Sequence, residues 1–440
     1  MSRTSSTPLP SSSHEPLTAS NWWVIVACAA IMVTEGFDLL IFSNAIPSLL
    51  TDASLGIDKV AVGSIGSMIF VGMLLGGLVA GKATQTLGLM RTAMLGFACF
   101  TVTTALIGLA QTGWQIGLLR FLAGLGLGVV LPAGLSLARK HVQQRHGALA
   151  ISVVMSGIPV GGMLAAMVSH AIIPSWGWRP LFAAAGVLGL LVMALIGPYL
   201  ARIEQRDRLA AAHQDHATAT DPLSGQPLDW RAILRGASLP VLALGTLATL
   251  ADLLTWYGVS VWLTQLMREF EVPFSGAMQL MFTLNIGAVA GSLLTASLAM
   301  RWGTRPVAML AGVVASLCLL LIASRWLSST AMLPVIALLG MSAISAQNLV
   351  NALVADAFPV QYRAAAIGIT LGLGRLGAVI APALGGHILA SGHGPSWVLV
   401  VFAISAVAGV LLLLGFTPRR SAASVAYLND QARSRPHGIR

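Results

Sequence analysis

Twelve apolar runs, each long enough to cross a lipid bilayer as a helix, follow one another along this chain of 440 residues. A hydrocarbon core of about 30 Å needs a helix of about 20 apolar residues. Charged residues make up only 9% of the chain, whereas they make up about a quarter of a soluble domain. The sequence therefore predicts an all-α polytopic membrane protein. The expected spans are 22–50, 61–81, 92–111, 114–138, 147–172, 181–200, 239–267, 277–300, 307–324, 331–355, 364–390 and 396–416.

The basic residues are distributed very unevenly between the predicted loops. If the N-terminus lies in the cytoplasm, nineteen of the 25 Lys and Arg residues face the cytoplasm, and four face outward: Lys59, Arg179, Arg268 and Arg325. Positive charge collects on the cytoplasmic side of membrane proteins, so both termini are predicted to be cytoplasmic. Topology thus explains the net charge of +10, and we expect no nucleic-acid partner.

A polar stretch at residues 201–238 separates six spans from six. We expect a cytoplasmic tail at 1–20, a six-helix bundle at 21–200, a cytoplasmic central loop at 201–238, a second six-helix bundle at 239–417 and a cytoplasmic tail at 418–440. The halves also repeat weakly at an offset of 215 residues, since Gly72, Gly76, Gly88, Ala93, Met94 and Leu95 match Gly287, Gly291, Gly303, Ala308, Met309 and Leu310. This six-plus-six repeat is the plan of the major facilitator transporters, whose site lies at mid-membrane between the halves.

Motifs along almost the whole chain resemble those of one family in that superfamily. The segment MVTEGFDLLIFSNAIP (32–47) resembles the acidic-Gly-aromatic-Asp signature of the aromatic acid:proton symporters. Further segments are similar to the family's motifs in order and spacing: RFLAGLGLGVVLP, SGIPVGG, WGWRPLF, NIGAVAG, FPVQYRAAAIG and LGLGRLGAVIAP. The resemblance implies the major facilitator fold and import of a small aromatic carboxylate, such as a hydroxybenzoate, with protons across a bacterial inner membrane.

The chain departs from the family pattern in two places. The first acid of the signature, usually Asp, is Glu35 here. The loop between the second and third spans, GKATQTLGLMR, lacks the Asp and the base that the superfamily normally carries there. Because that loop is usually implicated in gating the cytoplasmic face, the second departure concerns gating and leaves the expected substrate unchanged.

Two carboxylic acids in the first span are the strongest functional candidates. A charge at bilayer depth costs a few kcal/mol or more, so it usually has a function. Glu35 and Asp38 are three residues apart on a helix and therefore share a face. We interpret both as proton carriers, with Asp38 also in the substrate site. The alternative is a structural ion pair with Arg120 or Arg375.

The two arginines within spans are assigned different roles. Arg375 lies near mid-membrane among glycines, and its planar guanidinium matches a carboxylate with two parallel hydrogen bonds. We therefore predict that it binds the substrate; the alternative is a permanent countercharge to the first span. The family resemblance suggests that Arg120 tunes proton exchange, the alternative being an arginine that extends to the outer interface.

Several other polar and aromatic residues are weaker candidates. Trp256 and Tyr257 are candidates to stack on an aromatic ring, although aromatic residues near helix ends often form an interfacial belt. Gln347 and Asn348 are candidate partners for ring hydroxyls, although polar side chains commonly join helices. Asp252, in the seventh span, is either a second proton site or a packing residue.

No phosphate-binding loop, metal-ligand spacing or nucleotide-hydrolysing domain is evident, so we expect neither an enzyme nor a cofactor. The predicted partners are the aromatic carboxylate, protons and the lipid bilayer, and we take the protein to be a monomer. Three alternatives remain open: proton-coupled efflux of drugs or other organic ions, uptake of a non-aromatic organic acid, and a sensor of aromatic acids that signals without transport.

Overall fold

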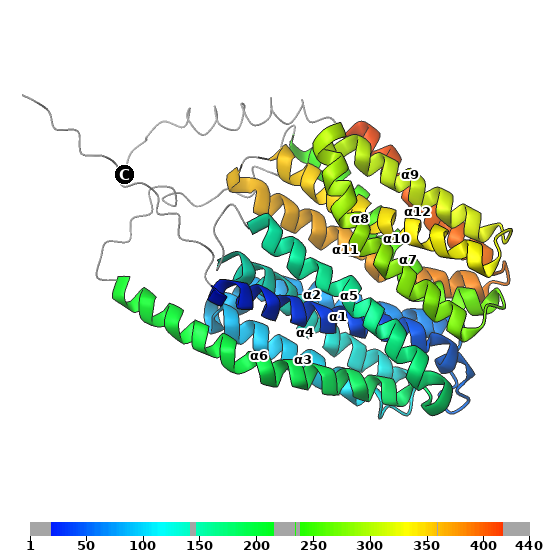
Figure 1. Cartoon of the computed structure of the whole chain (residues 1–440), viewed down its shortest axis with the longest axis horizontal. Helices are drawn as coiled ribbons and strands as arrows, with labels where there is room; N and C mark the ends of the chain where they lie inside the picture. Colours follow the sequence, from blue (N-terminus) through cyan, green and yellow to red (C-terminus); the bar gives the residue numbers. More distant parts are fainter. Residues whose placement is uncertain (1–18, 141–146, 215–233, 235–237, 359, 417–440) are drawn as a thin grey trace, which may run out of the picture.

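The computed structural model describes residues 19–140, 147–214, 234, 238–358 and 360–416. Twelve α-helices fill these ranges (Figure 1), and each is long and apolar enough to cross a membrane. The predicted all-α fold with twelve spans is confirmed, and the protein is a multi-pass membrane protein. The helices are α1 (Ala19–Thr51), α2 (Lys59–Leu87), α3 (Leu89–Ile107), α4 (Gly113–Lys140), α5 (Gly147–Trp176), α6 (Arg179–Gln214), α7 (Ser238–Glu269), α8 (Phe274–Trp302), α9 (Thr304–Ala323), α10 (Ser329–Ala357), α11 (Val360–Ala390) and α12 (Pro395–Gly415).

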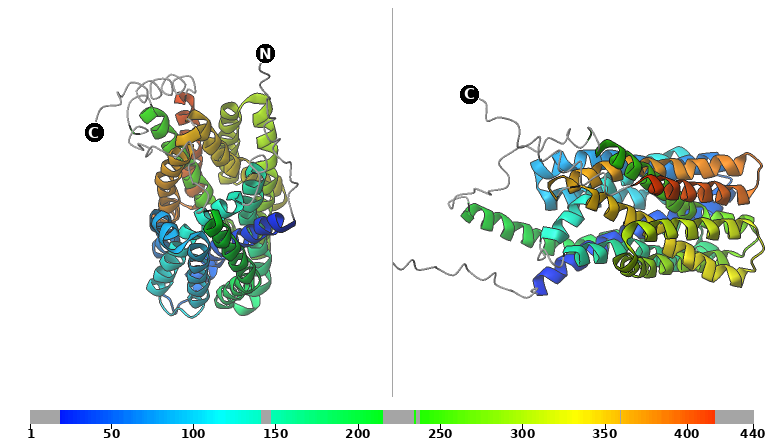
Figure 2. Two further views of the ribbon diagram at one scale, coloured as in Figure 1. Left: turned by 90° about the vertical axis from the view of Figure 1, so that its left-hand side faces the viewer. Right: turned by 90° about the horizontal axis from the view of Figure 1, so that it is seen from above.

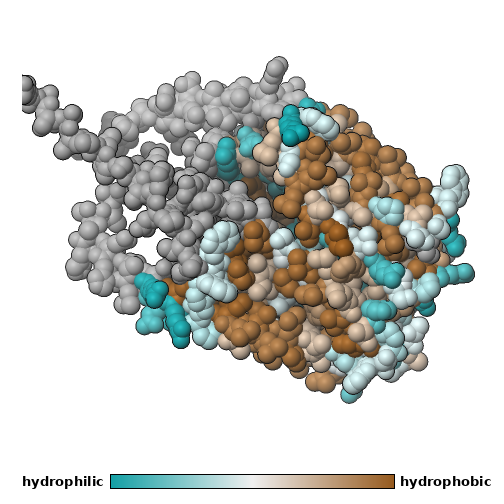
Figure 3. Space-filling model, viewed as in Figure 1, coloured by the Kyte–Doolittle hydropathy of each residue, from teal (hydrophilic) through white to brown (hydrophobic). Residues whose placement is uncertain are grey.

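Helices α1–α6 and α7–α12 form two bundles, which lie side by side in Figure 1 and in the left view of Figure 2. Hydrophobic residues cover much of the face seen in Figure 3. Exposed apolar side chains occur in both bundles, for example Leu78, Leu195 and Leu317. Apolar side chains suit contact with lipid tails, and the backbone polar groups beneath them are already paired within the helices. The six-plus-six arrangement predicted from the sequence is confirmed.

The weak sequence repeat corresponds to a repeated helix crossing. A Cβ atom added to Gly76 of α2 would lie 2.3 Å from the carbonyl oxygen of Leu125 on α4. The matching Gly291 of α8 meets α10 in the same way, since its Cβ would lie 2.4 Å from the carbonyl oxygen of Met341. Small residues allow such close backbone contact between membrane helices. The repeated glycines therefore build the same helix pair in each bundle.

Two matched glycines also form the shortest connections in the described chain. Gly88 alone separates α2 from α3 and has φ 89°, and Gly303 alone separates α8 from α9 with φ 91°. Residues with a side chain rarely adopt this backbone conformation, so glycine is favoured at both positions. Most of the segment expected as the loop between the second and third spans is therefore helical.

Helix α6 also extends further than hydropathy predicts. Its apolar span ends at Ile203, but the helix continues to Gln214 and so covers the beginning of the predicted central loop. Hydropathy reports where a helix leaves lipid, whereas the backbone hydrogen bonds that define the helix persist in water. The rest of that loop, 215–233 and 235–237, lies outside the described residues, as do the two predicted tails for the most part.

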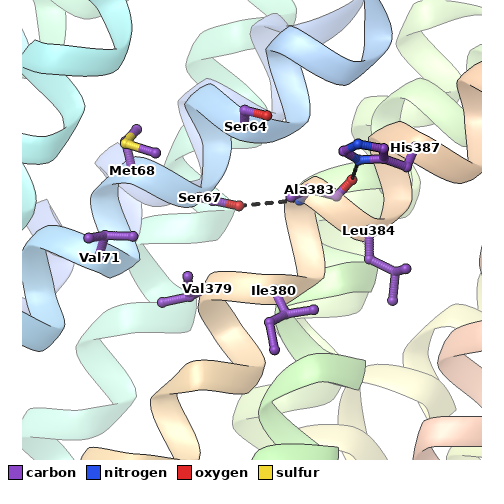
Figure 4. A pocket seen from close by; sticks show the side chains of 9 residues that line it. All are labelled: Ser64, Ser67, Met68, Val71, Val379, Ile380, Ala383, Leu384 and His387. Atoms are coloured by element: carbon purple, nitrogen blue, oxygen red, sulfur yellow. Dashed lines mark hydrogen bonds between the residues drawn. The ribbon is translucent and has the colours of Figure 1, made fainter.

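The bundles are in tight contact at the end where α1 connects to α2. A Cβ atom on Gly63 of α2 would lie 2.6 Å from the carbonyl oxygen of Pro382 on α11, and the backbone N–H of Ala383 donates to Ser67 Oγ at 3.2 Å. Figure 4 shows this seam, where an open and mostly apolar groove of about 510 Å³ follows the two helices. Its lining residues are Ser64, Ser67, Met68, Val71, Val379, Ile380, Ala383, Leu384 and His387.

Helices α1 and α7 join the bundles at the same end. Ser43 Oγ donates to the carbonyl oxygens of Ser260 and Val261 at 2.6 and 2.7 Å, and Thr264 Oγ1 donates to Asn44 Oδ1 at 3.1 Å. All these side chains and backbone groups are buried. Buried hydrogen bonds between the bundles, together with the α2–α11 seam, close the molecule at this end.

Toward the opposite end, the facing surfaces of α2 and α11 separate. A Cβ atom added to Gly77 of α2 would lie 3.7 Å from Nη1 of Arg375 on α11. Gly81 lies about one helical turn further along α2, and Gly368 about two turns before Arg375, so both are on the faces that meet at the arginine. Within the described part of the chain, a Cβ added at either glycine would meet nothing within 4 Å. The two helices therefore diverge beyond Arg375.

Candidate functional site

The candidate charged residues of the first span are fully enclosed. Glu35 and Asp38 are each 1% exposed on α1, and Arg120 of α4 is also 1% exposed. Burying an unpaired charge is strongly unfavourable, so such groups need nearby counter-charges or protons. The three ionisable side chains predicted from the sequence therefore lie inside the protein and not on its lipid-facing surface.

Asp38 belongs to a group formed by three helices of the first bundle. Thr104 of α3 donates its hydroxyl to Asp38 Oδ1 at 2.9 Å, and Arg120 of α4 is an electrostatic neighbour of the carboxylate. The Arg120 guanidinium carbon lies 3.8 Å from the ring centre of Phe42, one turn after Asp38 on α1. This cation–π contact and the burial of Arg120 place its head inside the bundle, which excludes the alternative of an arginine at the outer interface.

The Asp38 group keeps unused hydrogen-bonding capacity. Three polar atoms of this group are buried without a hydrogen-bond partner among the residues that the structure describes: Asp38 Oδ2, Arg120 Nε and Arg120 Nη1. A buried polar atom without a partner is costly, and such atoms often belong to sites that bind something or change state. The arrangement can therefore accept or release a proton on Asp38 beside a fixed positive charge.

Arg375 connects the second bundle to the first. Its Nη1 atom donates to the carbonyl oxygen of Met73 on α2 at 3.4 Å, and the side chain is only half-buried. Glu35 lies within electrostatic range of both Arg375 and Asp38. The structure thus brings Glu35, Asp38 and Arg375 into one chain of charges that crosses the boundary between the bundles.

Tyr257 of α7 lies beside this charged group. It is half-buried and is an electrostatic neighbour of both Glu35 and Arg375. Its ring also packs on Phe70 of α2, with ring centroids 4.5 Å apart. Among the predicted ring contacts, Tyr257 is therefore placed next to the arginine, whereas the neighbouring Trp256 is buried in the hydrophobic core.

The predicted amide residues lie on α10, where Gln347 pairs within its own helix and Asn348 pairs with α8. Gln347 Nε2 donates to Asn351 Oδ1 at 2.9 Å, and Asn348 Nδ2 donates to Ser292 Oγ of α8 at 3.4 Å. None of the hydrogen bonds found in the described part of the chain joins either amide to Arg375. Gln347 Oε1 is nevertheless buried without a partner, so this residue keeps a free acceptor.

Asp252 lies away from these residues, between α7 and α12. It is 7% exposed, and a Cβ on Gly409 of α12 would lie 3.1 Å from its Oδ1 atom. Its Oδ2 atom is buried without a hydrogen-bond partner. Asp252 therefore faces the interior of the second bundle, and the structure does not bring it to the Arg375 group.

Sequence reasoning missed three side chains of the site: Phe42, Phe70 and Thr104. Phe42 had a detectable signal, because it lies four residues after Asp38 and hence on the same helix face. Phe70 and Thr104 had none, because their roles depend on which helices become neighbours. Within the described residues, no group of three or more His, Cys, Asp or Glu side chains is arranged to hold a metal ion.

Comparison with known proteins identifies the family. The sequence model of the Major Facilitator Superfamily matches residues 28–256 and 245–433. The chain is 31% identical to the gentisate transporter of Corynebacterium glutamicum, covering 87% of this chain and 84% of that protein. It is 28% identical to the benzoate transport protein of Acinetobacter baylyi, covering 92% of this chain and 91% of that protein.

Solved structures agree with the fold. The crystal structure of a D-xylose-proton symporter matches with a TM-score of 0.71 at 15% identity, covering 91% of this chain and 99% of that chain. An inward open conformation of the xylose transporter from E. coli matches with a TM-score of 0.70 at 14% identity, covering 92% and 99% of the two chains. The chain belongs to the major facilitator superfamily of transporters, in its aromatic acid:proton symporter family.

Proposed function

We propose that the protein imports a small aromatic carboxylate, such as a hydroxybenzoate, by proton symport through alternating access. The observation that carries the proposal is the position of Arg375, a half-buried cation of the second bundle that reaches α2 and lies near Glu35 of the first. Two relatives are named for transport of gentisate and of benzoate, which are both small aromatic carboxylates.

Arg375 is the proposed binding group for the substrate carboxylate. Its present hydrogen bond, to the carbonyl oxygen of Met73, is long at 3.4 Å. A carboxylate accepts two parallel, charge-assisted hydrogen bonds from guanidinium, and these are about twice as strong as neutral ones. The substrate would therefore displace the Met73 contact at little cost.

Glu35 is the proposed link between substrate and proton. While no substrate is bound, ionised Glu35 is a counter-charge for Arg375. When a substrate carboxylate takes that role, Glu35 is left as an unneutralised anion inside the protein and is stabilised by taking up a proton. The net charge of this group is then the same before and after loading, which couples anion binding to protonation.

Asp38 is the second proposed proton carrier, with Arg120 as the group that tunes it. Protonation of Asp38 would remove the counter-charge of Arg120, whose Nε and Nη1 atoms are buried without a hydrogen-bond partner among the described residues. The positive charge of Arg120 would then favour release of the proton. Thr104 holds Asp38 in place through its hydrogen bond to Oδ1.

The remaining predicted substrate contacts are proposed from their neighbours. Tyr257 lies near Arg375 and Glu35, so it is the proposed contact for the substrate ring. Gln347, with its unpaired Oε1 atom, would accept a hydrogen bond from a ring hydroxyl. Trp256 and Asn348 are proposed to support the same region from α7 and α10.

Alternating access is proposed to be a rocking of the two bundles, 21–200 and 239–417, about this central group. With both termini in the cytoplasm, the closed end formed by α1, α2, α7 and α11 faces outward, and the structure corresponds to an inward-facing state. The proposed location is a bacterial inner membrane, and the proposed functional unit is a monomer.

Uptake by proteoliposomes tests the proposal. Purified protein is reconstituted, and accumulation of labelled benzoate is measured with and without an inward-directed proton gradient. We expect accumulation above the external concentration only with the gradient. Gradient-driven loss of preloaded benzoate would support efflux instead, and absence of both uptake and exchange would contradict the transport assignment for this substrate class.

A further inference from the structure

Phe70 and Tyr257 form an aromatic pair across the boundary between the bundles. Phe70 belongs to α2 and Tyr257 to α7, their ring centroids are 4.5 Å apart, and the ring planes are inclined by 57°. Phe70 is 3% exposed, whereas Tyr257 is only half-buried. The pair is thus mostly enclosed, and part of Tyr257 remains accessible.

The aromatic pair lies directly beside the proposed carboxylate-binding arginine. Phe70 precedes Met73 by three residues on α2, so the two lie on one helix face, about 4.5 Å apart along the axis. Met73 is the residue whose carbonyl oxygen accepts from Arg375. On the opposite side, Tyr257 is an electrostatic neighbour of Arg375. The aromatic pair therefore lies next to the position where a carboxylate would bind Arg375.

The pair also marks the limit between the closed and separated parts of the molecule. On one side of Phe70, α2 contacts α11 through the backbone at Gly63 and through the side-chain hydroxyl of Ser67. On the other side lie Arg375 and then Gly81, where a Cβ added to the glycine would have no described residue within 4 Å. A substrate that enters from the separated end would meet Arg375 and the aromatic pair together and could go no further.

We propose that Phe70 and Tyr257 together form the surface that recognises the substrate ring, so that Phe70 is a specificity-determining residue. This inference rests on the proposed function, because it assumes that Arg375 holds a carboxylate. A benzoate bound to Arg375 places its ring against the separated-end face of the pair. Edge-on and offset contacts between aromatic rings are favoured beyond the area they bury, whereas a saturated ring gains only the buried area.

Transport selectivity tests the inference. Initial rates of uptake are measured for benzoate and for cyclohexanecarboxylate, which has a similar size and charge but no aromatic ring. In Phe70→Leu and, separately, Tyr257→Leu, we expect KM for benzoate to rise about three- to tenfold, the size of effect expected for a lost aromatic contact. KM for cyclohexanecarboxylate should change much less, and Vmax should be similar for the two substrates in each variant.

Two further variants separate recognition from packing. Phe70→Tyr keeps the ring and should keep the preference for benzoate. Phe100→Leu is a matched control, because Phe100 is also 3% exposed and also pairs with another aromatic ring. Its partner, Phe97, belongs to the same bundle. Phe100→Leu should leave the ratio of the two KM values unchanged.

The outcomes distinguish this inference from the proposed function. If the wild-type protein accumulates benzoate but Phe70→Leu and Tyr257→Leu both keep its ratio of KM values, the ring is recognised elsewhere and the inference is overturned. A proportional rise of both KM values in both variants would also overturn it. If the wild-type protein moves neither acid, the proposed function fails as well.

Discussion

The Nζ atom of Lys59 lies 2.6 Å from Oε1 of Glu269 and thereby joins the start of α2 to the end of α7. Gln265 Nε2 donates to the same glutamate oxygen at 2.9 Å. This ion pair lies at the closed end of the molecule, next to the α2–α11 seam. It connects the two bundles only in a state where that end is closed.

Removing the ion pair should favour opening of the closed end. Both side chains are partly exposed, at 34% and 25%, so the pair is expected to contribute only about 0.2–1 kcal/mol to closure. Lys59→Gln should therefore raise the population that is open at the seam by at most about fivefold. The measurement uses Ser67→Cys, because Ser67 is buried in the seam. The rate at which a membrane-impermeant maleimide labels this cysteine reports how often the seam opens.

The control for this prediction is Lys82→Gln. It removes the same charge from the exposed Lys82 near the other end of α2 and should leave the labelling rate unchanged. Equal labelling rates in Lys59→Gln and in the Ser67→Cys parent would show that the ion pair does not hold the closed state.

Asp38→Asn should abolish uptake driven by a pH gradient. Asparagine keeps the size of the side chain and the acceptor for Thr104, but its amide does not titrate near neutral pH and so cannot carry a proton. Exchange of labelled for unlabelled benzoate at equal pH, which needs no net proton movement, should be affected far less. Full gradient-driven accumulation by Asp38→Asn would rule out Asp38 as a proton carrier.

Arg375→Lys should weaken substrate binding although it keeps the positive charge. Lysine is a point charge and does not offer the two parallel donors of guanidinium. Because a hydrogen bond to a charged group contributes about 1.5–3 kcal/mol, we expect KM for benzoate to rise about ten- to hundredfold. An unchanged KM in Arg375→Lys would exclude recognition through two parallel hydrogen bonds.

Gly340→Ala should destabilise the second bundle. A Cβ at Gly340 would lie 1.9 Å from the backbone oxygen of Leu284, so α8 and α10 would have to move apart. Forcing extra atoms into a packed interior costs about 1–3 kcal/mol, and we expect a lower thermal unfolding midpoint of the purified protein. Gly117→Ala is the matched control, because the nearest atom to its Cβ would be a side-chain carbon of Ile65 at 3.7 Å. A Gly340→Ala midpoint equal to that of Gly117→Ala would contradict the proposed packing.

The sequence by itself was sufficient for the membrane fold. Apolar side chains face lipid or the packed interior of a bundle, so the twelve spans and the polar stretch between the halves can be predicted from hydropathy. The glycine repeat can be found by comparing the two halves of the sequence. The ionisable residues within spans were readable for the same reason, since Glu35, Asp38, Arg120 and Arg375 interrupt apolar runs. Helix ends were less accessible, because α2 and α6 continue as helices beyond the ends of the spans predicted from the sequence.

The pairing of those residues was decided only by the tertiary structure. The contact between Arg375 and Met73 joins residues 302 positions apart, and Phe70 meets Tyr257 across the same boundary. Hydropathy measures the preference of each helix for lipid over water, and nearly all helices here share that preference, so it does not identify which helices become neighbours. Close backbone packing at glycines selects the neighbours, and it is this packing that places Glu35 beside Arg375 and Asp38 beside Arg120.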